Sequence, residues 1–293
     1  MDDVITGDRV IRLSDLALIP IDEQEFHTSL PIGGNLLYFT DFRSDASTIA
    51  MMCNRFDYRP IVYVYSDQLQ DFLQFVYPHL EREIVLLAHN GDVTFSNDTL
   101  DIGKYPLVYR WILQDNLVRE ENVSGNTEKK VFSIPIGIAN AMFNNGDLSL
   151  IESVIDEGIE KEILCLANHS TLTSKEYRSR VDVLILLHPF IVYRNGQHYQ
   201  SYLRTMAAAE YCLCPRGKGL DTHRIAEALL LGTIPIVKKG EYPVGLSLPV
   251  IEVDDWFTIT EGYLLTLKKP LVNSDTLQEL SLKYWKELLE TFR

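Results

Sequence analysis

Residues 210–239, EYCLCPRGKGLDTHRIAEALLLGTIPIVKK, decide the fold of this 293-residue chain. The pattern predicts a short apolar strand at 211–214, a glycine-rich basic loop at 215–220, a helix capped by Asp221 and a second apolar strand at 234–237. This order of strand, loop, helix and strand is typical of an α/β sheet. In such a sheet, ligands bind where the loop leaves a strand's carboxyl end and enters the next helix.

The loop and the first helical turn carry the groups that bind an anion. Arg216, Lys218 and Arg224 are cations, and the free N–H groups of a first helical turn attract negative charge. Gly217 and Gly219 have no β-carbon, so the backbone can approach a ligand closely there. We therefore expect a phosphate group to bind at this loop.

Helical spacing divides the predicted helix into a buried side and a ligand-facing side. The buried stripe holds apolar or small residues at intervals of three and four: Ile225, Ala228, Leu229 and Gly232. His223, Arg224 and Glu227 share the other side. There Arg224 could meet a pyrophosphate while Glu227 accepts hydrogen bonds from ribose hydroxyls, as a nucleoside diphosphate requires. The alternative is an ordinary ion pair between Arg224 and Glu227, with Arg216 and Lys218 as solvated loop charges.

The string CPRGKGLDTHRIAEALLLGTIPIV at 214–237 closely resembles the donor motif of exostosin-like (family 47) glycosyltransferases, particularly small viral members that act as xylosyltransferases. The resemblance is dense at 211–237 and weaker upstream. It implies a GT-B fold, with two Rossmann-like domains facing a central cleft, and inverting transfer of a sugar from a UDP-sugar, with xylose as the best guess. The donor-binding residues that it implies are Arg216, Gly217, Lys218, Gly219, Asp221, His223, Arg224 and Glu227.

Composition limits the compartment and the partners. The net charge of −14 and pI near 4.9 predict a surface that repels nucleic acid and anionic membranes. The chain has no apolar run of eighteen residues, and its acidic start MDDVITGDRV does not resemble a signal peptide. We expect no membrane anchor and a cytoplasmic protein, as for a virus-encoded relative. Four cysteines in or beside apolar segments favour reduced thiols and core filling over a metal site: Cys53, Cys165, Cys212 and Cys214.

The first half of the chain also alternates strands and helices. We expect an irregular lead-in over 1–34, a first strand at 35–39, a strand and helix over 60–77 and a strand at 84–88, followed by His89, Asn90, Gly91 and Asp92. Inverting transfer needs a base for the acceptor hydroxyl, and Asp92 or His89 could supply it. The resemblance supports this region, since exostosin-like chains often carry a similar HN-x-D turn. The alternative is a turn formed only for its backbone chemistry.

The predicted boundary between domains lies near residue 150. Residues 1–150 would bind the acceptor and 151–270 the donor, and a helix in 271–293 would pack back toward the first domain through Trp285, Leu288 and Leu289. In the second domain, Asn168 ends a strand and could line the donor cleft, whereas we expect Arg178 to lie in solvent. In the first, Trp111 and Tyr109 are expected in the core more than against a sugar.

The resemblance therefore implies an inverting, UDP-sugar-dependent glycosyltransferase that acts on an oligosaccharide or glycoprotein glycan. The chain contains no Asp-x-Asp, so we expect no catalytic metal and no cofactor besides the donor substrate, which would be UDP-xylose. The alternative is a catalytically inactive nucleotide-sugar-binding protein. A dehydrogenase is disfavoured because no G-x-G-x-x-G follows a predicted strand.

Overall fold

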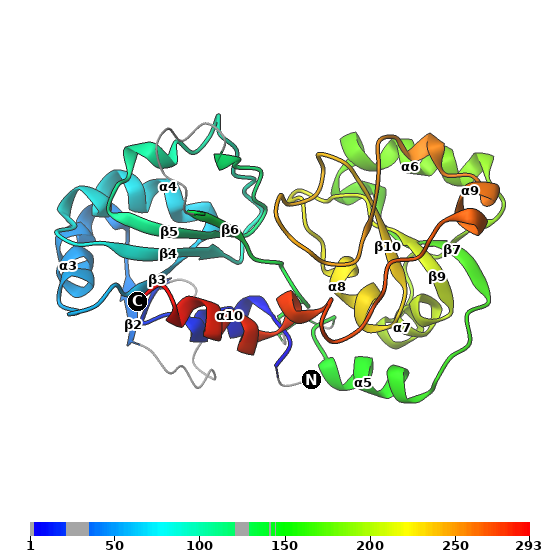
Figure 1. The fold of residues 1–293 in the computed structure, drawn as a ribbon, viewed down its shortest axis with the longest axis horizontal. Coiled ribbons are helices and arrows are strands. Elements are labelled where there is room, and N and C mark those ends of the chain that lie inside the picture. Colours follow the sequence, from blue (N-terminus) through cyan, green and yellow to red (C-terminus); the bar gives the residue numbers. More distant parts are fainter. Residues whose placement is uncertain (1–2, 22–34, 121–128, 141, 144) are drawn as a thin grey trace. The chain divides into compact units, whose positions relative to one another are not determined.

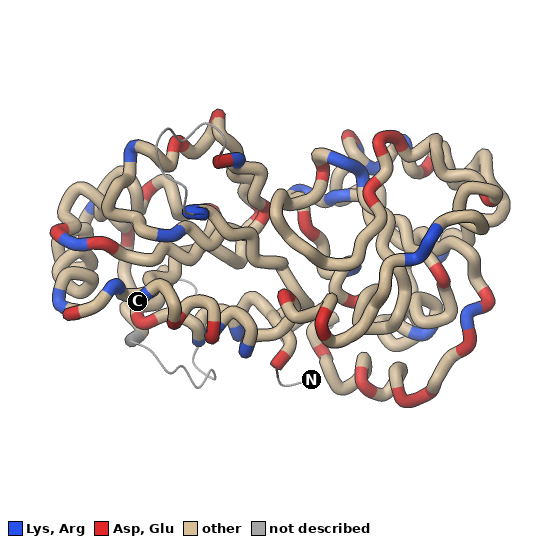
Figure 2. Tube along the Cα trace, viewed as in Figure 1, with Lys and Arg blue, Asp and Glu red and all other residues tan. Residues whose placement is uncertain are grey.

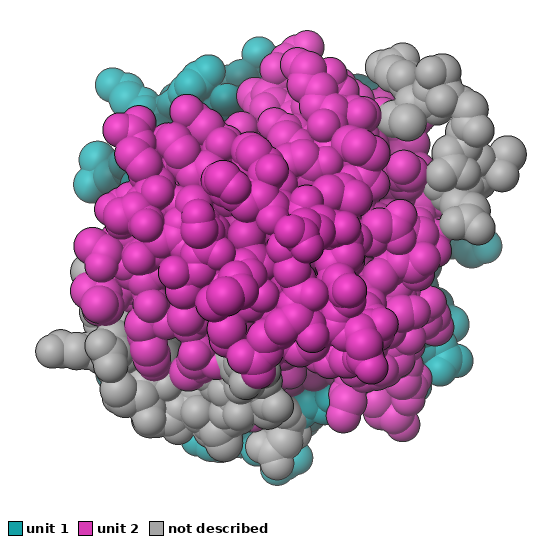
Figure 3. Space-filling view, turned by 90° about the vertical axis from the view of Figure 1, so that its left-hand side faces the viewer, with its two compact units in different colours: residues 1–4, 137–243, 247–280 teal, residues 5–136, 244–246, 281–293 magenta. Residues whose placement is uncertain are grey.

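The computed structural model describes residues 3–21, 35–120, 129–140, 142–143 and 145–293. The chain divides into two compact units, which Figures 1 and 3 show. Unit 1 comprises residues 1–4, 137–243 and 247–280, and unit 2 comprises residues 5–136, 244–246 and 281–293. The main division thus falls between residues 136 and 137, earlier than the expected boundary near residue 150.

Six parallel strands form the sheet of unit 2 among its described residues, in the order β2-β1-β3-β4-β5-β6. The strands are β1 Leu16–Pro20, β2 Asn35–Phe39, β3 Ile61–Tyr65, β4 Ile84–His89, β5 Val108–Leu113 and β6 Val131–Ser133. The expectation of an irregular lead-in over 1–34 is wrong at β1, which pairs with both β2 and β3. Residues 22–34 of that expectation lie outside the described part.

Both faces of this sheet are covered by helices. Alternate residues of β1 belong to different apolar clusters, Leu16 and Leu18 to one and Ala17 and Ile19 to the other. The helices of the first face are α3 Phe42–Asn54 and α4 Leu69–Asp71, which continues through turns to residue 79, and those of the second are α1 Gly7–Val10 and α10 Leu282–Glu290. Burial on both faces explains why the strands are apolar throughout.

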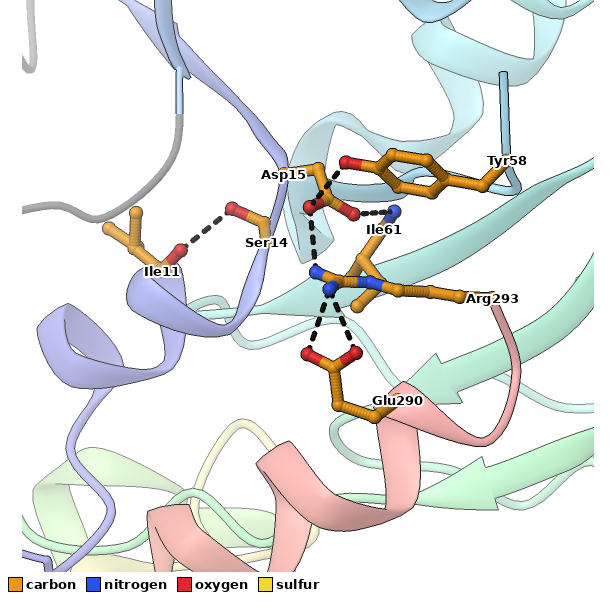
Figure 4. A network of polar contacts seen from close by, with 7 residues as sticks. All are labelled: Ile11, Ser14, Asp15, Tyr58, Ile61, Glu290 and Arg293. Carbon is orange, nitrogen blue, oxygen red and sulfur yellow. Dashed lines mark hydrogen bonds and ion pairs between the residues drawn. The ribbon is translucent and has the colours of Figure 1, made fainter. Parts of the chain in front are cut away.

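The last helix is fixed to unit 2 by apolar and ionic contacts. Trp285 is 2% exposed in the second cluster. Asp15 accepts hydrogen bonds from the Ile61 backbone N–H at 2.8 Å and from Arg293 at 2.7 Å, and Arg293 also contacts Glu290 at 2.8 Å, as Figure 4 shows. A carboxylate placed just before β1 therefore joins β3 to Arg293, three residues after the end of α10.

Unit 1 contains a second parallel sheet in its described residues, in the order β11-β10-β9-β7-β8. The strands are β7 Ile163–Ala167, β8 Ile191–Tyr193, β9 Ala209–Leu213, β10 Ile234–Lys238 and β11 Ile251–Val253. The helices are α5 Leu148–Asp156, α6 Lys175–Leu187, α7 Tyr199–Ala207, α8 His223–Leu230 and α9 Glu261–Thr266. The predicted alternation of strands and helices is confirmed here.

Counted within each unit, both sheets share the order second, first, third, fourth and fifth strand, and the sheet of unit 2 continues to a sixth. The direction of winding reverses beside the first strand, between β1 and β3 in unit 2 and between β7 and β9 in unit 1. In α/β sheets, ligands bind at this switch point, outside the carboxyl ends of the strands. The mixed α/β class with two parallel sheets is confirmed.

Two further features concern the acidic surface and the length of the apolar helices. Figure 2 shows acidic residues along the helices and loops of both units. Among the described residues, no helix has both the length and the apolar content needed to span a membrane.

Candidate ligand-binding site

A cavity of about 600 Å³ lies in unit 1 at the carboxyl ends of its strands. Its lining includes the segment after β7 (Asn168, Ser170), the segment after β8 (Arg194, Gln197), residues of α6 and α7, and the start of α8. Since β7 and β9 flank the point where the winding reverses, the cavity occupies the position where this fold binds ligands.

The helix α8 begins and ends differently from the prediction. Thr222, not Asp221, is its N-cap residue, and the buried Asp221 carboxylate accepts a hydrogen bond from the Thr222 N–H at 2.8 Å. Gly232 does not belong to a buried stripe; it is exposed and has φ 68°, the left-handed conformation in which glycine commonly ends a helix. Ile225, Ala228 and Leu229 are buried as predicted.

Four of the predicted residues come together in the cavity lining. His223, Arg224 and Glu227 project from α8, and Asn168 follows β7. Arg224 Nε donates to Asn168 Oδ1 at 2.5 Å, whereas Glu227 accepts from tyrosine hydroxyls of α7. No ion pair between Arg224 and Glu227 is seen among the described residues, which argues against the ordinary intrahelical pair.

Arg178 contradicts the expectation that it lies in solvent. It is 5% exposed and lines the cavity, where its Nε donates to the Arg216 carbonyl at 2.9 Å and its Nη1 to the Ser170 carbonyl at 2.7 Å. Burial, with the positive charge of Arg224, lowers the pKa of Arg178 from 12.5 to about 10. Two guanidinium groups thus share one cavity, and an anion between them would relieve their repulsion.

The basic loop itself supports this cavity and does not line it. Arg216 lies over the Tyr177 ring at 4.3 Å and donates to the Lys218 carbonyl at 2.7 Å, and the Lys218 side chain is exposed. A β-carbon on Gly217 would lie 3.3 Å from Arg178 Nη2, so glycine makes room for that guanidinium. Arg216, Gly217, Lys218, Gly219 and Asp221 are not in the lining.

Three lining residues carry buried polar atoms that lack a hydrogen-bond partner among the described residues: Asn168 Nδ2, Gln197 Oε1 and Thr222 Oγ1. Neighbouring groups fix the orientation of the two amides, those of Asn168 and Gln197. Asn168 presents its oxygen to Arg224, which leaves its NH2 group as the free donor. The Thr205 hydroxyl donates to the Ser201 carbonyl, so it accepts from Gln197 Nε2 at 2.9 Å and leaves Gln197 Oε1 as a free acceptor.

These atoms divide the cavity lining into two chemical sets. Arg178, Arg224 and Asn168 Nδ2 are donors, which suit phosphate oxygens. Glu227 and Gln197 Oε1 are acceptors, which suit hydroxyl or N–H groups. Buried polar atoms without partners are rare in folded proteins, and the three in this lining are available to a polar ligand.

The proposed catalytic turn lies in unit 2, after β4. His89 is fully buried, and its Nε2 lies 3.0 Å from the Pro135 carbonyl. Asn90 has φ 62°, and its N–H donates to Gln114 Oε1 at 2.8 Å. Asp92 is exposed, and its N–H donates to Asp67 Oδ1 at 3.2 Å. The backbone of the turn is thus held by Gln114 and Asp67, while the Asp92 carboxylate faces solvent.

The aromatic residues of β5 are structural. Trp111 is fully buried in the first cluster, as predicted. Tyr109 packs against the second cluster, and the guanidinium groups of Arg59 and Arg110 each lie 3.8 Å from its ring centre.

No model of a known protein family matches the chain.

Proposed function

We propose that the protein is an inverting glycosyltransferase of the exostosin-like type. It would transfer a sugar, with xylose as first candidate, from a UDP-sugar to a hydroxyl group of an oligosaccharide or glycoprotein glycan. A GT-B arrangement of the two units is part of this proposal. The observation that carries it is a cavity at the switch point of unit 1 that combines the buried Arg178 and the half-buried Arg224 with the Glu227 carboxylate.

The donor set suits the diphosphate. Arg178 and Arg224 would bind its oxygens, Asn168 Nδ2 would add a neutral donor, and the first turn of α8 would add backbone N–H groups. As the bond to the sugar breaks, the diphosphate gains negative charge. Fixed donors in a shielded cavity stabilise that charge, which is the role a divalent metal has in other enzymes.

The acceptor set suits the nucleoside. Glu227 would accept hydrogen bonds from ribose hydroxyls, as an acidic residue does in other nucleotide-binding α/β sheets. For the acceptor sugar, Asp92 is the better candidate base because its carboxylate is exposed. The His89 ring is buried and contacts the Pro135 carbonyl. This contact favours a role for His89 in positioning the turn over a role in proton transfer.

Calorimetric titration with UDP, GDP, UDP-xylose and UDP-glucose, with and without EDTA, tests the donor site first. We expect uridine ligands to bind equally well in EDTA, and loss of binding in EDTA would overturn the metal-independent mechanism. No binding of any nucleotide would overturn the donor assignment.

Two variants test the division of roles. Glu227→Ala should weaken UDP binding, whereas Asp92→Asn should keep UDP binding and lose transfer of the sugar to a glycan or to water. Equal loss of binding in both variants would contradict these roles. A wild-type protein that binds UDP-sugars but never releases UDP would instead be a catalytically inactive nucleotide-sugar-binding protein.

A further inference from the structure

We propose that Tyr199 and Tyr202 are positioning residues that hold Glu227 so that the cavity selects a ribose with both hydroxyl groups over a deoxyribose. The inference rests on the proposed function, because it takes the ligand to be a nucleoside diphosphate. It adds two residues and a specificity that the sequence motif does not contain.

The contacts of Glu227 are symmetrical. The Tyr199 hydroxyl donates to Oε1 at 3.1 Å, and the Tyr202 hydroxyl donates to Oε2 at 2.5 Å. Glu227 is 4% exposed, and all three residues line the cavity. Each carboxylate oxygen has two lone pairs, so one on each oxygen remains for a ligand. Two adjacent acceptor sites match the two adjacent hydroxyls of a ribose.

Toward Glu227 both tyrosine hydroxyls act as donors. Burial, followed by the negative charge of Glu227, raises the pKa of both phenols, so both hydroxyls keep their protons. Their rings lie 5.9 Å apart on the first turns of α7, and the Tyr199 ring is 6% exposed. A glutamate side chain is otherwise free to turn about three bonds. Two hydroxyl contacts from α7 remove that freedom before the ligand arrives.

The phenylalanine variants test this arrangement because they remove a hydroxyl and keep the ring. We would titrate wild type, Tyr199→Phe and Tyr202→Phe with UDP and with 2′,3′-dideoxy-UDP. The control is Tyr211→Phe: Tyr211 is fully buried in unit 1, its hydroxyl donates to the Leu264 carbonyl at 3.2 Å, and it does not line the cavity.

Wild type should prefer UDP over the dideoxy ligand by about tenfold or more, since the ligand loses charge-assisted hydrogen bonds to Glu227. Tyr202→Phe should reduce that preference by about five- to tenfold, mainly by lowering the affinity for UDP. Tyr211→Phe should leave the preference unchanged. A purely structural role of Tyr202 would weaken both ligands equally and would overturn the inference.

The remaining outcomes are distinct. A wild type that binds neither ligand would refute the proposed function itself. A wild type that binds both ligands equally would refute the contact between Glu227 and the ribose, and this inference with it, but would leave the diphosphate assignment intact. Phe variants that keep the wild-type preference would refute only the role of the tyrosines. If a Phe variant does not fold, Glu227→Gln gives the second test. It should reduce the preference for UDP as strongly, and a preference that survives this variant would overturn the inference.

Discussion

Replacing Arg178 with Met should weaken UDP binding strongly and change the stability of the ligand-free protein little. The structure provides opposing contributions to stability. A fall in the pKa of Arg178 from 12.5 to about 10 corresponds to a cost of about 3 kcal/mol for keeping it charged. Its hydrogen bonds to the Ser170 and Arg216 carbonyls return about 1.5 kcal/mol each. We therefore expect the free energy of unfolding to stay within about 1.5 kcal/mol of wild type.

Ligand binding has no such compensation. A guanidinium contact with phosphate contributes about 2 to 3 kcal/mol, so UDP affinity should fall about 30- to 150-fold. Uridine lacks the diphosphate, and its affinity should not change. Urea denaturation measures stability, and calorimetry with UDP and uridine measures binding.

The matched control lies on the same helix. Arg180 is two residues along α6 from Arg178, has an exposed side chain and pairs with Asp255 at 2.7 Å. Arg180→Met should leave UDP binding unchanged, because the side chain is not in the cavity lining. The reasoning is refuted if Arg178→Met binds UDP as wild type does, or if it loses uridine and UDP to the same extent.

Two further predictions concern stability. Burial, with the charge of Arg224, lowers the pKa of His169 from 6.5 to about 4, so the unfolded chain binds a proton that the folded protein does not. The free energy of unfolding should fall by up to about 3 kcal/mol between pH 6.5 and pH 4. Urea titrations at several pH values should find this fall absent in His169→Gln. A fall of the same size in the variant and in wild type would contradict the prediction. A β-carbon on Gly146 would lie 2.1 Å from the Asn140 carbonyl oxygen, so Gly146→Ala should cost about 2 kcal/mol or more. Gly262→Ala, in α9 with no atom within 4 Å of the new β-carbon, should gain about 0.5 kcal/mol, and equal melting temperatures for the two variants would exclude the clash.

The sequence predicts β9 and β10 of unit 1 because each is a short apolar run, and a helix with regular spacing lies between them. It fails at β1 for a physical reason. LALIP is buried on both faces, so it has no alternation, and Pro20 stands at its last position, where a proline is tolerated but reads as a break. Only its pairing with β2 and β3 identifies it as a central strand.

The residues of the candidate site also fall into those that local spacing predicts and those that it does not. Arg224 and Glu227 lie within one helix, so spacing alone places them on one side. Arg178, Gln197 and the tyrosines reach the cavity because β8 and β9 flank β7 in the sheet, and sheet order is not encoded in local spacing. The available signal was position: these residues follow the carboxyl ends of β7 and β8, the edge where this fold binds ligands.

The excess of acidic residues makes the geometry of the cavity more important. A chain of net charge −14 repels a nucleoside diphosphate at long range, so affinity must come from contacts inside the cavity. Charge alone would then be insufficient at position 178. Arg178 uses two edges of its guanidinium to hold the Ser170 and Arg216 carbonyls, which leaves Nη2 beside Gly217. A lysine would keep the charge but could not hold both carbonyls and still present a fixed donor, so Arg178→Lys should lose most of the affinity that Arg178→Met loses.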